Sequence, residues 1–117
     1  MDMVVNNLLK DLEDAGQSEN TIIFFYSDHG TGLPRHKRWL FDTGVKVPLI
    51  VYIPKAFKNI YPSDPGSEIN RLVSFIDLAP TVLNLTNAEI PSTMQGQAFL
   101  GKGLNTESEH VHIARGR

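Results

Sequence analysis

The hydrophobic and polar positions of the chain first follow a helical pattern. Apolar residues recur on one helical face between residues 3 and 15, and polar residues occupy the other face. Gly16 follows directly and is suited to end a helix in the left-handed conformation. This pattern predicts an amphipathic helix from about residue 3 to residue 15. Its apolar face consists of Val5, Leu8, Leu9, Leu12 and Ala15.

Two short apolar runs, residues 21–26 and 47–53, show no alternation of apolar and polar positions. This pattern is typical of a strand that is covered on both faces. Pro48 lies near the start of the second run and Pro54 follows its end, where proline is compatible with a strand. We therefore predict two central strands of one sheet.

The chain over residues 57–70 reads as a surface loop. It is rich in proline and glycine, and Asp64, Pro65 and Gly66 have the composition of a turn. A candidate short strand lies at residues 110–114.

Residues 73–85 have apolar side chains at mostly helical spacing and predict a helix that ends near residue 85. Ser74 and Asp77 have the spacing of a capping box, and Pro80 fits only within the first turn or so. Asp77 is therefore interpreted as a cap or turn residue and not as a catalytic acid. Helix, strand, loop, strand, loop and helix together predict an α/β fold in a single domain over residues 1–117.

The composition excludes several classes of function. The chain has no Cys, so it contains no disulfide, thiolate metal site or cysteine nucleophile. Its formal net charge of -2 lacks the cationic excess that nucleic acids and anionic membranes attract. No apolar stretch approaches the ~18 residues that a membrane-spanning helix needs. We expect neither a nucleic-acid nor a membrane partner.

Polar residues end the first apolar run abruptly, in the order Ser27, Asp28, His29, Gly30. In open α/β sheets, ligands bind beyond the carboxyl ends of the strands. Asp28 offers a hard oxygen to a divalent cation, while the nitrogen of His29 favours zinc or manganese over calcium. Two ligands do not complete a site, and an Asx-type turn with a solvated imidazole is the alternative interpretation.

Four consecutive residues, Arg35, His36, Lys37 and Arg38, form a cationic cluster in the connection between the two runs. This connection is long for irregular chain inside a compact domain, and such loops are often functional. Guanidinium and ammonium groups suit a tetrahedral anion, so the cluster is a candidate anion site; an ordinary solvated loop is the alternative. His110 and His112 would share one strand face and are a weaker candidate metal pair.

Three stretches of the sequence together resemble the sulfatases of the alkaline phosphatase superfamily. They are NTIIFFYSDHG (20–30), KRWLFDTGVKVPLIVYIP (37–54) and VSFIDLAPTVLNL (73–85), the last followed by PSTMQGQAFLG (91–101). The likeness is to the C-terminal part of the catalytic domain. It implies an incomplete part of a mixed, largely parallel β-sheet flanked by helices.

The resemblance also implies roles for individual residues. In this family an Asp followed by Asn or His at such a strand end binds the active-site divalent cation, which points to Asp28 and His29 and, by family, to calcium. The lysine seven residues before the glycine of a G-V-x-x-P motif contacts the sulfate group, which points to Lys37 as catalytic and substrate-binding. Arg35 and His36 are further expected substrate contacts. The implied substrate is a sulfated small molecule or a sulfated glycan.

The chain also departs from the family. The sulfatase nucleophile is formylglycine, made from Cys or Ser in a C/S-x-P-x-R motif, but the chain has no Cys and its SDPGS stretch at Ser63 lacks the arginine. The first metal-binding carboxylate pair of the family is missing as well. We therefore expect the first half of a sulfatase to lie upstream of Met1, and this chain alone to be inactive. Exposed strand edges of such a fragment predict self-association.

Two other functions remain open at this stage. An Asp-His pair also occurs in related phosphonate monoester and phosphodiester hydrolases that favour transition metals. A non-catalytic remnant would bind no metal tightly, because Asp28 and His29 alone are too few ligands. The family is commonly exported to the periplasm, the lysosome or the medium, and nothing in residues 1–14 has the pattern of a signal peptide.

Overall fold

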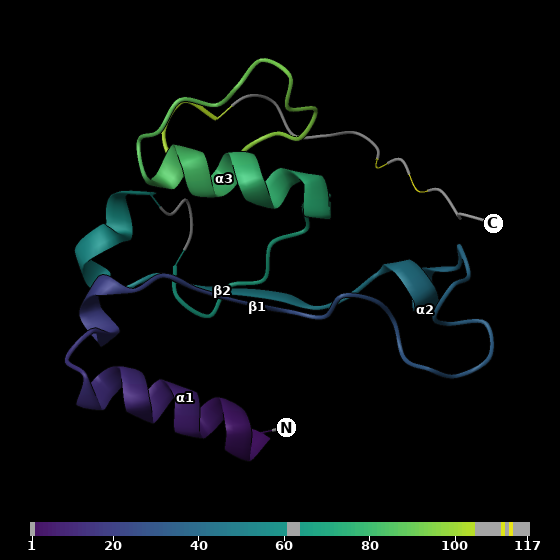
Figure 1. Ribbon diagram of the computed structural model, residues 1–117, viewed down its shortest axis with the longest axis horizontal. Helices are drawn as coiled ribbons and strands as arrows, with labels where there is room; N and C mark the ends of the chain where they lie inside the picture. Colours follow the sequence, from purple (N-terminus) through teal and green to yellow (C-terminus); the bar gives the residue numbers. More distant parts are fainter. Residues whose placement is uncertain (1, 61–63, 105–110, 112, 114–117) are drawn as a thin grey trace. The chain divides into compact units, whose positions relative to one another are not determined.

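A computed structural model describes residues 2–60, 64–104, 111 and 113. The described residues form two compact units, one up to Lys58 and the other from Asn59 to Ile113. Figure 1 shows the elements in chain order. The helices and strands are α1 (Asp2–Asp14), η1 (Ser18–Asn20), β1 (Ile23–Tyr26), α2 (Asp42–Val45), β2 (Leu49–Tyr52), η2 (Lys55–Ile60), η3 (Phe75–Asp77) and α3 (Leu78–Leu85). Within the described part, every helix is too short or too polar to cross a membrane.

Helix α1 confirms the predicted N-terminal helix and its end. Gly16 has a positive φ of 66°, and its N–H donates to the carbonyl of Glu13. The N–H of Gln17 donates to the carbonyl of Leu12, which completes a Schellman motif. Glycine reaches this left-handed conformation without a Cβ penalty, so the helix ends here for a local reason.

Strands β1 and β2 confirm both predicted strands and form an antiparallel, two-stranded sheet in the described part of the chain. Figure 1 shows the two strands side by side. Ile23 lies opposite Tyr52, and Tyr26 lies opposite Leu49. An antiparallel pair is compatible with the expected mixed sheet, and the described residues form no parallel pair. A parallel pair needs a crossover that runs back along the sheet, usually as a helix. The connection over residues 27–48 contains only the four-residue helix α2, so the chain returns beside β1 in the opposite direction.

Both strands were predicted to be covered on both faces, and the described residues do not provide that cover. Residues opposite each other in the register share a face of the sheet. On the face that carries Phe25, Ile50 and Tyr52, these side chains are 39%, 60% and 47% exposed, respectively. The apolar sequence of the strands thus exceeds what the described elements bury.

The second unit is organised around α3 and the chain that follows it. Ser74 and Asp77 form the predicted capping box before α3, and Pro80 lies in the first turn of the helix, so both predictions are confirmed. The predicted turn is also present, because the N–H of Ser67 donates to the carbonyl of Asp64 and Gly66 has a φ of 82°. The candidate strand at residues 110–114 lies outside the described residues.

Three polar side chains of η3 and α3 hold the segment of residues 97–102 by its backbone. The carboxylate of Asp77 accepts the N–H of Gln97 at 2.8 Å, in addition to the N–H of Ser74. Residues 81 and 84 continue this stripe one and two turns later. Thr81 Oγ1 accepts the N–H of Phe99, and the amide of Asn84 bonds both the N–H and the carbonyl of Lys102. The segment so held buries Phe99 and Leu100.

Candidate active site

The predicted site residues lie beyond the end of β1, in a loop whose base is closed by two glycines. The N–H of Gly30 donates to the carbonyl of Gly44 at 3.1 Å. A Cβ on Gly30 would collide with the carbonyl of Thr43, and a Cβ on Gly44 would collide with the carbonyls of His36 and Trp39. Only glycine therefore allows this approach of the backbones. We call residues 31–43, between the two glycines, the site loop.

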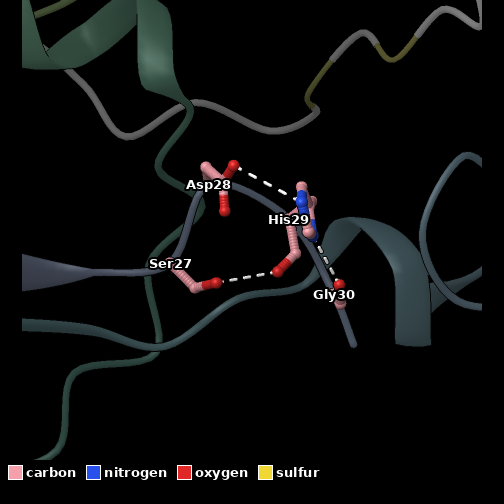
Figure 2. A network of polar contacts seen from close by, with 4 residues as sticks. All are labelled: Ser27, Asp28, His29 and Gly30. Carbon is pink, nitrogen blue, oxygen red and sulfur yellow. Dashed lines mark hydrogen bonds and ion pairs between the residues drawn. The ribbon is translucent and has the colours of Figure 1, made fainter. Parts of the chain in front are cut away.

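Asp28 and His29 form a compact turn before the site loop, and Figure 2 shows its contacts. The Ser27 hydroxyl donates to the carbonyl of His29 at 2.8 Å. Nδ1 of His29 lies 2.6 Å from the carbonyl oxygen of Gly30, and Nε2 lies 3.4 Å from Oδ2 of Asp28. The turn therefore engages both ring nitrogens of His29.

The contact with Gly30 decides which nitrogen of His29 carries the proton. A carbonyl oxygen can only accept a hydrogen bond, so Nδ1 must be the N–H donor. In the neutral ring, Nε2 then carries a lone pair and faces the carboxylate of Asp28. This is the usual arrangement of a metal-binding histidine, in which a carbonyl orients the ring through its other nitrogen.

The spacing of these two atoms suits two neighbouring ligands of one cation. A separation of 3.4 Å is expected for a tetrahedral pair with bonds of about 2.1 Å to zinc, or for an octahedral pair with bonds of about 2.4 Å to calcium. Asp28 is exposed and His29 is half-buried, so an ion could reach them. Within the described residues, no group of three or more His, Asp or Glu side chains surrounds them. The pair fits part of a metal site and needs further donors.

The cationic cluster lies in the site loop and is fixed there through its backbone. The N–H of Lys37 donates to the carbonyl of Thr31 at 3.0 Å, which places Lys37 beside the chain that directly follows His29. The Thr43 hydroxyl donates to the carbonyl of Arg35. The side chains of the cluster's arginines and lysine are exposed and form no ion pair with any residue that the structure describes. They are therefore available to an anion.

Sequence reasoning missed the hydroxyl residues that brace this loop. Thr31 contacts Lys37 through its carbonyl and Nδ1 of His36 through its hydroxyl, at 2.8 Å. The only signal in the sequence was the presence of threonines in a turn-rich segment, where hydroxyls often bond to nearby groups. Trp39 and Phe41 stack with their ring centroids 6.1 Å apart on the same loop, and both are exposed.

Two residues of the cluster adopt the left-handed conformation that favours glycine and asparagine. Arg35 and Arg38 have φ values of 66° and 69°. For a residue with a long side chain this conformation costs about 1 kcal/mol. Such strain is often found at functional sites, where the surrounding structure maintains it.

We expect Arg38→Asn to raise the free energy of unfolding by up to about 1 kcal/mol, because asparagine tolerates this conformation better than arginine. Urea unfolding of the protein measures the change. Arg38→Gln is the matched control, because it removes the same charge without this tolerance. Equal stabilities of the two variants would show that residue 38 is not held in the left-handed conformation.

Comparison with known proteins identifies the family of this chain. The Sulfatase family model matches residues 1–88. The chain is 45% identical over 117 residues to an ulvan-active sulfatase of Formosa agariphila, covering all of this chain and 19% of that protein. It is 36% identical over 103 residues to N-acetylglucosamine-6-O-sulfatase of Bacteroides thetaiotaomicron (85% of this chain, 17% of that protein). It is 38% identical over 106 residues to human N-acetylglucosamine-6-sulfatase (86% and 18%).

The chain belongs to the sulfatase family, and the resemblance noted in its sequence is confirmed. Its α/β elements agree with that membership. The chain spans about a fifth of the length of the curated relatives it matches. No solved structure matches it.

Proposed function

We propose that this chain is the C-terminal part of the catalytic domain of a metal-dependent sulfatase, in which the site loop binds the sulfate group of the substrate. The observation that carries the proposal is the bond from the N–H of Lys37 to the carbonyl of Thr31. It holds the cationic cluster beside the Asp28–His29 pair, so groups suited to an anion and groups suited to a cation lie in neighbouring segments. Sulfate-ester hydrolysis at a divalent cation needs both.

In this proposal each residue has a distinct task. Asp28 and His29 would hold a divalent cation, which would withdraw charge from the oxygens of the sulfate group. The Lys37 ammonium donates hydrogen bonds to those oxygens and stabilises the negative charge that grows during cleavage. Arg35 and His36 orient the same group. The family favours calcium as the metal, whereas the nitrogen ligand of His29 is also compatible with manganese or zinc.

The cation proposal predicts that Asp28→Asn weakens metal binding by roughly tenfold to a hundredfold, because it removes the negative charge of one of the ligands. Isothermal titration of the full-length protein with calcium, manganese and zinc measures this effect. Asp64→Asn is the matched control on an exposed aspartate of the other unit. Identical metal affinities for wild type and Asp28→Asn would show that Asp28 is not a metal ligand. The titration of the unchanged protein also ranks the three metals.

We further propose that residues upstream of this chain supply the formylglycine nucleophile and the remaining metal ligands. The coverage of about a fifth of each relative supports this view. On this view the isolated chain shows no sulfatase turnover and no tight metal site. The DNA upstream of the Met1 codon tests this proposal. An in-frame C/S-x-P-x-R motif supports it, whereas a stop codon or a true start signal favours a non-catalytic remnant.

The exposed apolar sheet face should also make the isolated chain self-associate, which light scattering measures.

The substrate class that we propose is a sulfated glycan. Three of the similar proteins are named for glycan or sugar sulfates, namely the ulvan-active sulfatase and the two N-acetylglucosamine sulfatases. Hydrolysis of ulvan and of a 6-sulfated N-acetylglucosamine by the full-length protein tests this, with inorganic sulfate release as the readout. Cleavage of a small aryl sulfate but of neither glycan would support sulfatase activity and contradict the proposed substrate class.

One observation supports a second candidate function, the hydrolysis of a phosphonate monoester or phosphodiester. The Nε2 lone pair of His29 facing Asp28 is a ligand set that transition metals accept readily. Comparing sulfate ester, phosphonate monoester and phosphodiester substrates with calcium and with manganese separates the two functions. Faster turnover of the phosphorus substrates with manganese would replace the sulfatase proposal.

A further inference from the structure

Thr31 contacts two expected substrate residues through two different oxygen atoms. Its carbonyl accepts the N–H of Lys37 at 3.0 Å, and its hydroxyl lies 2.8 Å from Nδ1 of His36. This contact can form in two ways: the hydroxyl donates to a lone pair on Nδ1, or it accepts the proton of an Nδ1–H group. When the hydroxyl is the donor, the proton of a neutral His36 ring lies on Nε2.

We propose that Thr31 is a positioning residue that holds His36 as the Nε2–H tautomer, so that His36 presents a neutral N–H donor to an oxygen of the sulfate group. The inference rests on the proposed function, because it assigns His36 to the substrate. It deepens that function by stating which atom of the ring meets the anion and which residue determines this.

The two histidines of the site then have opposite tautomers that match opposite ligands. A carbonyl takes the Nδ1 proton of His29 and leaves a lone pair on Nε2 for a cation. The hydroxyl of Thr31 occupies the Nδ1 lone pair of His36 and leaves a proton on Nε2 for an anion. A neutral N–H gives a directional hydrogen bond without adding charge. Of His36 and Lys37, Lys37 is then the charged contact to the anion.

Nitrogen NMR of the ¹⁵N-histidine-labelled full-length protein tests the tautomer directly. We expect the His36 signals of an Nε2–H ring in the wild type and in Thr31→Ser, and a mixture of tautomers in Thr31→Val. Thr43→Val is the matched control, because its hydroxyl bonds the carbonyl of Arg35 and not the ring of His36. Added inorganic sulfate should shift Nε2 of His36 in the wild type.

Steady-state kinetics on a sulfate ester gives a second readout. Loss of one positioned hydrogen bond should raise the KM of Thr31→Val about tenfold with kcat changed by less than about twofold, and Thr31→Ser should restore the wild-type KM. An Nδ1–H ring in the wild type, or an unchanged KM in Thr31→Val, overturns the inference and leaves the proposed function intact. Absence of sulfatase turnover defeats the proposed function itself, and the tautomer and the sulfate titration then still decide the role of Thr31.

Discussion

In the full-length protein, Lys37→Ala is expected to lower kcat/KM for a sulfate ester by about 10²–10³, the usual loss when one preorganised charge contact to a developing anion is removed. The side chain of Lys37 is exposed and forms no ion pair with the described residues, so the substrate is its expected partner. The reason is electrostatic. A positive group held beside the sulfate group stabilises the transition state more than the ground state, because negative charge on the leaving oxygen and the sulfate grows during cleavage.

Lys37→Ala should leave the free energy of unfolding unchanged. Exposed side chains without partners contribute within about 0.5 kcal/mol to stability, so urea unfolding of Lys37→Ala should match the wild type. Lys55→Ala removes the same charge from an exposed position in η2, outside the site loop, and should keep full activity. Lys37→Arg keeps the charge and should recover part of the loss. Full activity of Lys37→Ala would show that Lys37 does not contribute to the reaction.

Asp77→Ala is expected to lower the free energy of unfolding by about 3–5 kcal/mol, because it leaves two backbone N–H groups without their charged acceptor. Asp77 is only 8% exposed, and its carboxylate accepts the N–H groups of Ser74 and Gln97. The first bond caps η3 and the second holds the segment of residues 97–102. A single carboxylate thus joins parts of the chain that are twenty positions apart in sequence.

Hydrogen exchange and urea unfolding together test this role. The amides of Gln97 and Phe99 should lose their protection in Asp77→Ala, while the amides of α1 keep theirs. Asp77→Asn retains one acceptor oxygen and should lose about half as much stability. Glu89→Ala, at an exposed acidic position of the same unit, should be neutral within about 0.5 kcal/mol. A loss below about 1 kcal/mol in Asp77→Ala would show that water replaces the carboxylate at little cost.

Features with a local cause could be predicted from the sequence. Gly16 ends α1, Asp77 caps η3, and Pro80 lies in the first turn of α3, because each depends on residues within one helical turn. The strand positions also followed from apolar runs. The direction of β2 did not, because it depends on the path of the connecting loop, which has no periodic pattern.

The candidate site was predictable in its residue types and not in its hydrogen bonds. Asp28, His29 and the cationic cluster stood out by charge and by their place after an apolar run. Three features depend on the path of the backbone, which no residue type reveals: the tautomer of His29, the bond between Gly30 and Gly44, and the double contact of Thr31. For the same reason, the metal and substrate roles remain predictions for the experiments above.

The bond between Gly30 and Gly44 has a consequence for how the site loop can vary. Both ends of the site loop lie at the same end of the antiparallel strand pair, and the bond between Gly30 and Gly44 closes the loop at its base. The residues between them can therefore differ in length and chemistry while the strands keep their register. If the site loop binds the anion as proposed, grafting residues 31–43 between related proteins is expected to transfer anion recognition without rebuilding the sheet.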